Sequence, residues 1–314
     1  MSVVVIGDAN VDLEIRLPSS HNSIHANPDP VMSGGGSAAN TAAALARLGT
    51  SVRFVGTVGD DAAGRFAVGS LEQAGVDVAS IRTVGHESTV MVIVVVRDDG
   101  ERLIYVWPPR GGAHSELDTS MATGAVEGTS WLHVSGICLR VSPARDAMLA
   151  AMERARTAHV PVSLDLNLRL ENWGWEDGFR RIISEAIERS DVVLGSAADE
   201  ICAVARIGDP IEAATAIAGD ERLIVARLSE RGAIAVHHGV AVTSPGFQTE
   251  VVDTVGAGDA FNAGFIAARI AGASVSDAMT SGNAVAAFTI ARPGARSTPT
   301  GAELSAFQAD LPDI

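Results

Sequence analysis

The chain has 314 residues, of which 47% are hydrophobic, so it can bury a substantial core in one large domain or in two modest ones. Its formal net charge of −15 argues against binding nucleic acid through a broad basic face. All 23 basic residues are arginine, which excludes a Walker A site, a protein-kinase lysine and a pyridoxal Schiff base, since each of these needs a lysine.

The N-terminal segment, residues 2–7, is rich in β-branched side chains, which is typical of a buried parallel strand. No basic region precedes it, so it lacks the pattern of a signal peptide, and no apolar run approaches the length of a membrane span. Asn10 and Asp12 follow this strand. Because ligands of α/β sheets bind at the carboxyl ends of strands, Asp12 is a candidate binding carboxylate, although on position alone it could be a polar loop residue.

A glycine-rich segment precedes the next expected helix, which is rich in alanine and ends at Gly49. Gly35, Gly36 and Asn40 lie at the start of this helix. Their spacing is not Gly-x-Gly-x-x-Gly, and the first strand is not followed by a dinucleotide fingerprint either, which disfavours a dinucleotide oxidoreductase. Residues 71–78 have the pattern of a helix that ends at a Gly-Val-Asp sequence.

A hairpin is expected outside the main sheet. Residues 89–96 form an almost unbroken β-branched run, and a second run follows at residues 103–107. Asp99 and Gly100 between them are typical of a hairpin turn.

The centre of the chain alternates between strand and helix patterns, which predicts a parallel sheet. After one of these strands, Arg169 lies where its planar guanidinium could face a phosphate or a substrate carboxylate. Alternatively, Arg169 could form a salt bridge with Asp165 or Glu171. The expected strands are 131–137, 160–166 and 191–194, and the expected helices are 143–158 and 176–189.

A second glycine-rich segment, residues 253–265, lies between a strand-like and a helix-like pattern. Gly256, Ala257 and Gly258 stand where a helix should begin, so their backbone N–H groups could converge on an anion with support from the helix dipole. Asp259 then falls in the first turn, where a carboxylate can cap the helix and project toward the bound anion. The alternative is an ordinary glycine-rich turn with an acidic first turn.

This segment resembles the C-terminal signature of the ribokinase/PfkB family of sugar kinases, Asp-Thr-x-Gly-Ala-Gly-Asp-x-Phe, with every fixed position present. The resemblance extends from Val3 to Pro299 and includes the N-terminal signature Gly-Gly-x-x-x-Asn. It implies an α/β fold of the ribokinase-like type, a three-layer sandwich with a central, mostly parallel β-sheet, in a single domain over residues 1–314. A small β-sheet lid would be formed by residues 11–32 and 88–114.

The resemblance also implies roles for the two glycine-rich segments. In the family the last aspartate of the signature removes a proton from the sugar hydroxyl, a role that falls to Asp259, while the amides of Gly256, Ala257 and Gly258 stabilise the transferring phosphoryl group. The motif Asp-x-Asn-x-Arg is similar to that of fructokinase-like and 2-keto-3-deoxygluconate kinase-like members. The substrate-binding residues that follow are Asn10, Asp12, Gly35, Gly36, Asn40, Asn167 and Arg169.

Nucleotide and metal sites are implied as well, with several departures from the family pattern. The family's Asn-x-x-Glu motif, whose Glu organises Mg²⁺ through water, corresponds to Ser196-Ala-Ala-Asp199-Glu200, so that Asp199 aligns and Glu200 could substitute if the turn shifts. Ser229 replaces a family glycine, and His114 stands where the family often has asparagine. The implied nucleotide-binding residues are Ser196, Arg227, Ser229, Gly232 and Asn283, and the implied ligands of a monovalent cation such as K⁺ are Asp253 and Ser297.

The sequence therefore predicts an ATP-dependent sugar kinase that uses Mg²⁺ and acts on a ketose, a pentose or a related sugar. A 2-keto-3-deoxy sugar acid kinase, a nucleoside kinase and a silent sugar or nucleotide sensor remain alternatives. We expect a sugar and ATP as partners, neither nucleic acid nor a membrane, and leave open a homodimer through the lid. Cys138 and Cys202 provide neither a disulfide framework nor a metal spacing, which favours a cytoplasmic location.

Overall fold

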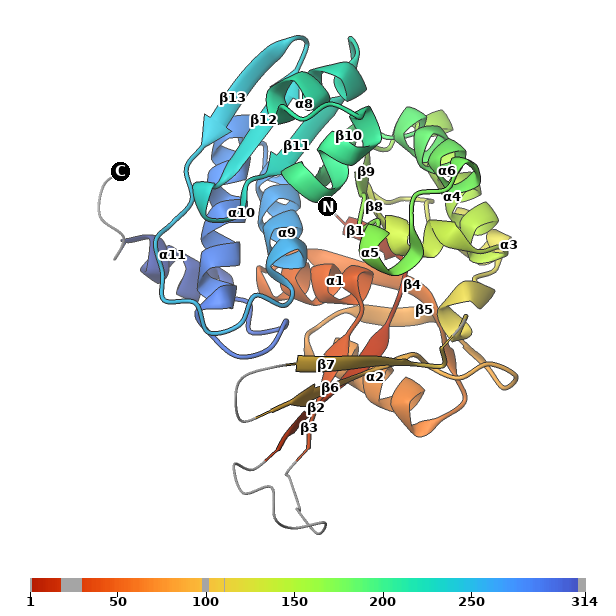
Figure 1. The fold of residues 1–314 in the computed structure, drawn as a ribbon. Coiled ribbons are helices and arrows are strands. Elements are labelled where there is room, and N and C mark those ends of the chain that lie inside the picture. The colour runs from red at the N-terminus through yellow and green to blue at the C-terminus, as the bar shows by residue number, and fades with distance from the viewer. Residues whose placement is uncertain (1, 18–29, 98–101, 110, 310–314) are drawn as a thin grey trace.

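The computed structural model describes residues 2–17, 30–97, 102–109 and 111–309 (Figure 1). Its main sheet has the strand order β13-β12-β11-β10-β9-β8-β1-β4-β5. Neighbouring strands are parallel from β5 across to β11, and only the β11–β12 and β12–β13 pairs are antiparallel, which confirms the predicted sheet. The strands are β1 (Ser2–Ile6), β4 (Ser51–Gly59), β5 (Asp77–Val84), β8 (Trp131–Ser135), β9 (Val162–Asp165), β10 (Val192–Ser196), β11 (Leu223–Arg227), β12 (Ala233–His237) and β13 (Val240–Ser244).

Helices cover both faces of this sheet and create two hydrophobic cores. In β1, Val3 and Val5 contribute to one core and Val4 and Ile6 to the other, because successive side chains of a strand point to opposite faces. The first core is completed by α1 (Ser37–Arg47), α9 (Ala257–Ile270) and α10 (Val275–Ile290). The second is completed by α3 (Thr119–Gly124), α4 (Ala144–Thr157), α6 (Asp177–Glu188) and α8 (Pro210–Ala218).

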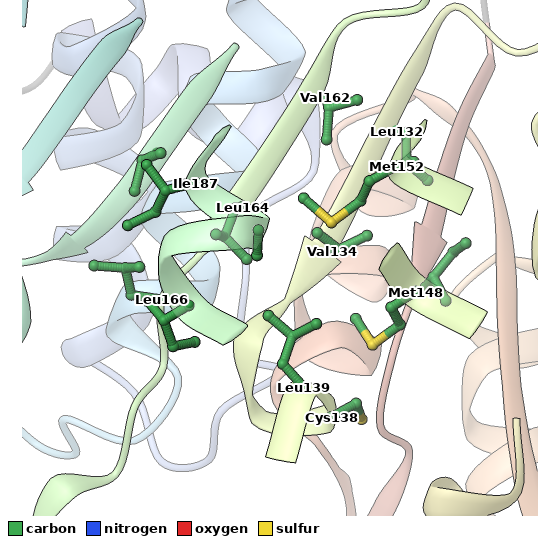
Figure 2. Close-up of a cluster of buried hydrophobic side chains, with 14 of the residues drawn as sticks. Leu132, Val134, Cys138, Leu139, Met148, Met152, Val162, Leu164, Leu166 and Ile187 are labelled. Carbon is green, nitrogen blue, oxygen red and sulfur yellow. The ribbon is translucent and has the colours of Figure 1, made fainter. Parts of the chain in front are cut away.

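Figure 2 shows the second core, where methionines of α4 lie among branched side chains of the sheet. Met148 and Met152 are fully buried in the same core as Leu132 and Leu164. The remaining helices are α2 (Ala62–Gln73), α5 (Leu170–Trp173), α7 (Cys202–Ala205) and α11 (Gly301–Ala309).

A second, smaller sheet has the strand order β3-β2-β6-β7 and lies beside the body of the molecule (Figure 1). Its strands are β2 (Asn10–Arg16), β3 (Val31–Gly35), β6 (Met91–Val96) and β7 (Arg102–Trp107). Strands β6 and β7 pair antiparallel, as expected for the predicted hairpin, while its Asp-Gly turn lies outside the described residues. The β7 side chains from Leu103 to Trp107 are exposed, so this sheet presents an apolar edge strand.

One predicted helix is wrong. Of residues 71–78 only Leu71–Gln73 are helical, as the end of α2, which starts earlier, at Ala62, where the Asp61 side chain accepts a hydrogen bond from the Gly64 N–H. Gly75 adopts a left-handed φ of 88° just beyond the end of α2, and residues 77–84 then form strand β5.

Within the described ranges, no helix combines the length and the apolar character that crossing a membrane would require.

Candidate active site

The two glycine-rich segments meet at Asp259. Helix α9 begins at Ala257, after Gly256 in the left-handed conformation, and a Cβ on Gly256 would lie 2.7 Å from the Cβ of Ala295. From α1, the hydroxyl of Ser37 donates to Asp259 Oδ1 at 2.6 Å, and Asn40 Nδ2 donates to Oδ2 at 3.0 Å. The expectation that Asp259 caps its own helix is therefore wrong, since its carboxylate points across to the start of α1.

The surroundings of Asp259 make its carboxylate unusually basic. Removal from water raises its pKa to about 7, and the nearby carboxylates of Asp165 and Asp8 act in the same direction. The hydrogen bonds from Ser37 and Asn40 oppose this shift because they stabilise the charged form. A group with such a pKa can exchange a proton near neutral pH.

Asp8, which the sequence reasoning overlooked, organises the start of α1. Its carboxylate accepts hydrogen bonds from the backbone N–H groups of Ser37 at 3.0 Å and of Ala38 at 3.2 Å. This contact fixes the first turn of the helix that carries Ser37 and Asn40. The signal that could have identified Asp8 is an acidic residue directly after the first buried strand.

Strands β2 and β3 contribute the predicted sugar-binding groups. A Cβ on Gly35 would lie 2.4 Å from Asp12 Oδ1, so the glycine provides the space that this carboxylate occupies. Burial raises the pKa of Asp12 to about 6, with the positive charge of Arg296 opposing the shift. Asn10 Oδ1 is buried and, in the described part of the chain, has no hydrogen-bond partner. Asn10 and Asp12 therefore offer acceptors for hydroxyl groups.

A pocket of about 430 Å³ opens beside Asp259 at the carboxyl ends of β9, β10 and β11. Such a position is where α/β sheets bind ligands. The polar residues that line it are Asp165, Asn167, Arg169, Glu171, Ser196, Asp199, Glu200, Arg227 and Asp259.

Arg227 is held inside this pocket by other protein groups. Its guanidinium donates to Asp165 Oδ1 at 2.9 Å and to Asn262 Oδ1 at 2.6 Å, and it lies 3.6 Å from Glu200 Oε2. The sequence suggested a nucleotide ligand for Arg227 but did not anticipate this ion cluster. Its charge serves first to compensate two buried carboxylates.

The residues expected near the metal lie on an unusual turn. Residues 197–201 form a single π-helical turn, which directs Glu200 inward and leaves Asp199 exposed at the pocket. Glu200 accepts hydrogen bonds from the backbone N–H groups of Leu168 at 2.8 Å and Ser196 at 2.7 Å, and burial raises its pKa. In the described part of the chain, no group of three or more acidic, histidine or cysteine side chains could hold a metal ion.

Arg169 faces the same pocket from a strained backbone. Its φ of 49° and that of Asn167, 39°, lie in the left-handed region, which non-glycine residues seldom adopt. Strain of this kind is concentrated at functional sites. Among the described residues Arg169 forms no ion pair with Asp165 or Glu171, and Asp165 pairs with Arg227 instead.

The other predicted residues lie outside the lining of this pocket. Asn283 Nδ2 donates to the carbonyls of Ser244 and Pro245, which ties α10 to the end of β13. Asp253 accepts hydrogen bonds from the backbone N–H groups of Val255 at 3.1 Å and Gly294 at 3.0 Å. Ser297 donates to the Pro293 carbonyl, and Ser229 and Gly232 form a turn after β11 with φ values of 56° and 90°.

Comparisons with known proteins match nearly the whole chain. The profile of the pfkB family carbohydrate kinases matches residues 1–301. An ATP-dependent ribose-1-phosphate kinase of Halopiger xanaduensis is 33% identical over 308 residues, which cover 97% of each protein. A fructokinase structure from Vibrio cholerae, with fructose, ADP and calcium bound, is 30% identical, with a TM-score of 0.80 and 98% of each chain covered.

A third similar protein is the aminoimidazole riboside kinase of Salmonella enterica, whose structure contains aminoimidazole riboside and an ATP analogue. It is 28% identical, with a TM-score of 0.78, and the match covers 99% of this chain and 100% of that one.

Proposed function

The chain belongs to the PfkB family of carbohydrate kinases, as its motifs predicted, and we propose that it transfers the γ-phosphate of ATP to a hydroxyl group of a ketose, a pentose or a related sugar. The observation that carries the proposal is the Asp259 carboxylate. It is held by Ser37 and Asn40 at the start of a helix, has a pKa of about 7, and borders a pocket large enough for phosphate groups.

In this proposal Asp259 is the general base. Its carboxylate takes the proton of the attacking hydroxyl, and a pKa near the working pH suits a group that must accept and then release a proton. The N-terminus of α9, at Gly256, Ala257 and Gly258, stabilises the negative charge of the transferring phosphoryl group. Phosphoryl transfer depends mainly on such positioning and charge stabilisation.

The sugar would bind between the small sheet and the body. Asp12 accepts from two hydroxyl groups, and Asn10 Oδ1, which otherwise remains buried without a partner in the described chain, accepts from another. The backbone of Gly35 and Gly36 and the side chain of Asn40 complete this side, and the small sheet would act as the lid.

The nucleotide phosphates would occupy the 430 Å³ pocket, with Arg169 directed at them from the end of β9. The residues present fit Mg²⁺, because this ion keeps several waters and binds through few carboxylates together with substrate phosphates. Asp199 and Glu200 would orient those waters, and the ion would neutralise charge on the phosphates.

The metal assignment predicts a changed Mg²⁺ requirement. Replacing Asp199 and Glu200 together by alanine should raise the Mg²⁺ concentration for half-maximal activity about 10-fold or more. Of the single variants, Asp199→Asn should account for most of the change, because Glu200 is already bonded by Leu168 and Ser196. The measurement is a Mg²⁺ titration of initial rates after removal of metal with a chelator.

Glu188→Gln, at the exposed end of α6, is the matched control and should titrate like the wild type. An unchanged titration in the double variant would show that neither carboxylate serves the metal.

The function itself is tested by coupled ADP release over ketoses, aldopentoses, ribose 1-phosphate, sugar acids and nucleosides. We favour a plain sugar, and the relatives named above favour ribose 1-phosphate or a riboside as the second candidate.

The Arg169→Gln variant should lose kcat with any sugar if Arg169 contacts the transferring phosphate. A rise in KM confined to a sugar acid would assign Arg169 to a substrate carboxylate instead. Nucleotide binding without turnover of any substrate would favour a silent sensor.

Two further assignments belong to the proposal. The exposed apolar strand β7 supports a homodimer through the lid, which the mass of the protein in solution would test. Asp253 and Ser297 lie on two segments that are joined by the hydrogen bond from the Gly294 N–H to the Asp253 carboxylate. A monovalent cation such as K⁺ would bind there to carboxylate and carbonyl oxygens of these segments.

A further inference from the structure

Arg296 lies at the junction of three elements around the sugar side of the site. Its Nε donates to Asn40 Oδ1 at 3.0 Å, Nη1 donates to the Ser70 hydroxyl at 2.6 Å, and Nη2 donates to the Gly35 carbonyl at 3.1 Å. These partners belong to α1, α2 and β3 respectively. One side chain from the segment after α10 therefore connects the body to the small sheet.

The bond to Asn40 has a direct consequence for Asp259. A carboxamide has a donor end and an acceptor end, and Arg296, which can only donate, must face the oxygen. The nitrogen of Asn40 is thereby directed at Asp259 Oδ2. The Asp259 carboxylate, which can only accept, favours the same orientation, so the Asn40 amide is held from both ends, and removal of Arg296 leaves its oxygen without the donor that fixes it.

Charge and space both indicate that this position is built for arginine. Asp12 and Asp259 are close enough to raise the pKa of Arg296, although burial lowers it to about 10, so the guanidinium stays charged at neutral pH. A Cβ on Gly34 would lie 2.2 Å from Nη1, so this glycine leaves room for the guanidinium. The sequence analysis assigned no role to Arg296 or Gly34.

We propose that Arg296 is a positioning residue for the catalytic base, holding the Asn40 amide against Asp259 and fixing strand β3 over the same site. The inference rests on the proposed role of Asp259. The other charged groups near Asp259 are Asp8, Asp165 and Arg227, and among the described residues none of them forms a hydrogen bond with the Asn40 side chain.

Arg296→Met removes the charge and all three bonds while retaining most of the volume. We expect kcat to fall about 10- to 100-fold, because the rate of phosphoryl transfer depends on the orientation of the Asp259 carboxylate toward the substrate hydroxyl. We also expect the acid limb of the pH–kcat profile to move upward by about one pH unit, since Asp259 loses a nearby cation and an ordered donor. Arg296→Lys should keep the limb near its original pH but recover only part of kcat, because an ammonium group cannot reproduce the planar fork.

Gly34→Ala tests the same contact while Arg296 itself is kept, because the new methyl group would push the guanidinium out of its position. It should shift the acid limb in the same direction as Arg296→Met. Gly69→Ala is the matched control: Gly69 precedes Ser70 in α2, has open space around its Cβ position, and its replacement should leave kcat and the pH profile unchanged.

Thermal unfolding of every variant separates a structural role from a positioning role. A lower melting temperature for Arg296→Met with an unchanged kcat and acid limb would overturn the inference, as would a rise in the sugar KM alone. If Arg296→Met gave either of these results and Asp259→Asn still lost activity, this inference would fail while the proposed function would stand. Full activity in Asp259→Asn would instead contradict the proposed function itself.

Discussion

Asp259→Asn should lower kcat about 10²- to 10⁴-fold, because asparagine keeps the shape of aspartate but cannot accept the proton of the substrate hydroxyl. Ser37 can still donate to the amide oxygen of the variant, so the start of α9 should remain in place. Nucleotide affinity should change little, because the helix N-terminus and Arg169 are untouched. Steady-state rates and ATP binding measured on the same preparation check both expectations.

The pH dependence of the wild type gives a second readout of the same group. Because burial raises the pKa of Asp259 to about 7, the base is protonated and inactive at lower pH. The rate should therefore rise as pH increases through about 7, rather than near the ordinary aspartate value, and this limb should be absent from the residual activity of Asp259→Asn.

Asp277→Asn is a suitable control, because Asp277 occupies the first turn of α10 outside the site. Its activity and pH profile should match the wild type. Undiminished turnover in Asp259→Asn would assign the proton transfer to another group.

The ribokinase-like α/β fold was predictable because its signals are local. Alternating strand and helix patterns in the centre of the chain specify a parallel sheet, and Gly256 specifies the left-handed residue from which α9 begins. The family signatures also linked the segment around Asn40 to that around Asp259, which are 219 residues apart. The α2 and β5 region was mistaken, because a helix pattern that ends at a glycine was placed too late in the sequence, and the strand expected at residues 131–137 ends at Ser135.

The contacts within the candidate site were less accessible from sequence. Arg296 follows α10 and reaches Ser70, which is 226 residues earlier, and no spacing rule connects such positions. The π-helical turn at residues 197–201 directs Glu200 inward, where the backbone N–H groups of Leu168 and Ser196 donate hydrogen bonds to its carboxylate. Residue types at these positions do not predict this arrangement. Arg227 was assigned from a motif, but its pairing with Asp165 requires strands β9 and β11 on either side of β10.

The cluster around Arg227 leads to the prediction with the largest effect on stability. Arg227→Met should lower the free energy of unfolding by about 3–5 kcal/mol, because it leaves Asp165 and Glu200 buried without the cation that compensates them. Glu200 already has a raised pKa, and the loss of Arg227 should raise it further. Denaturant unfolding at pH 7 measures the change.

The sign of the pH dependence identifies the cause. Protonation of Glu200 removes the uncompensated charge, so the deficit of Arg227→Met relative to the wild type should shrink as the pH is lowered, and adding Glu200→Gln should restore part of the stability at pH 7. Arg156→Met, which breaks an exposed pair with Glu153, should have no measurable effect, because exposed pairs are screened by solvent. If Arg227→Met proved as stable as this control, Arg227 would not be compensating the buried carboxylates, and its charge would be available to the nucleotide phosphates instead.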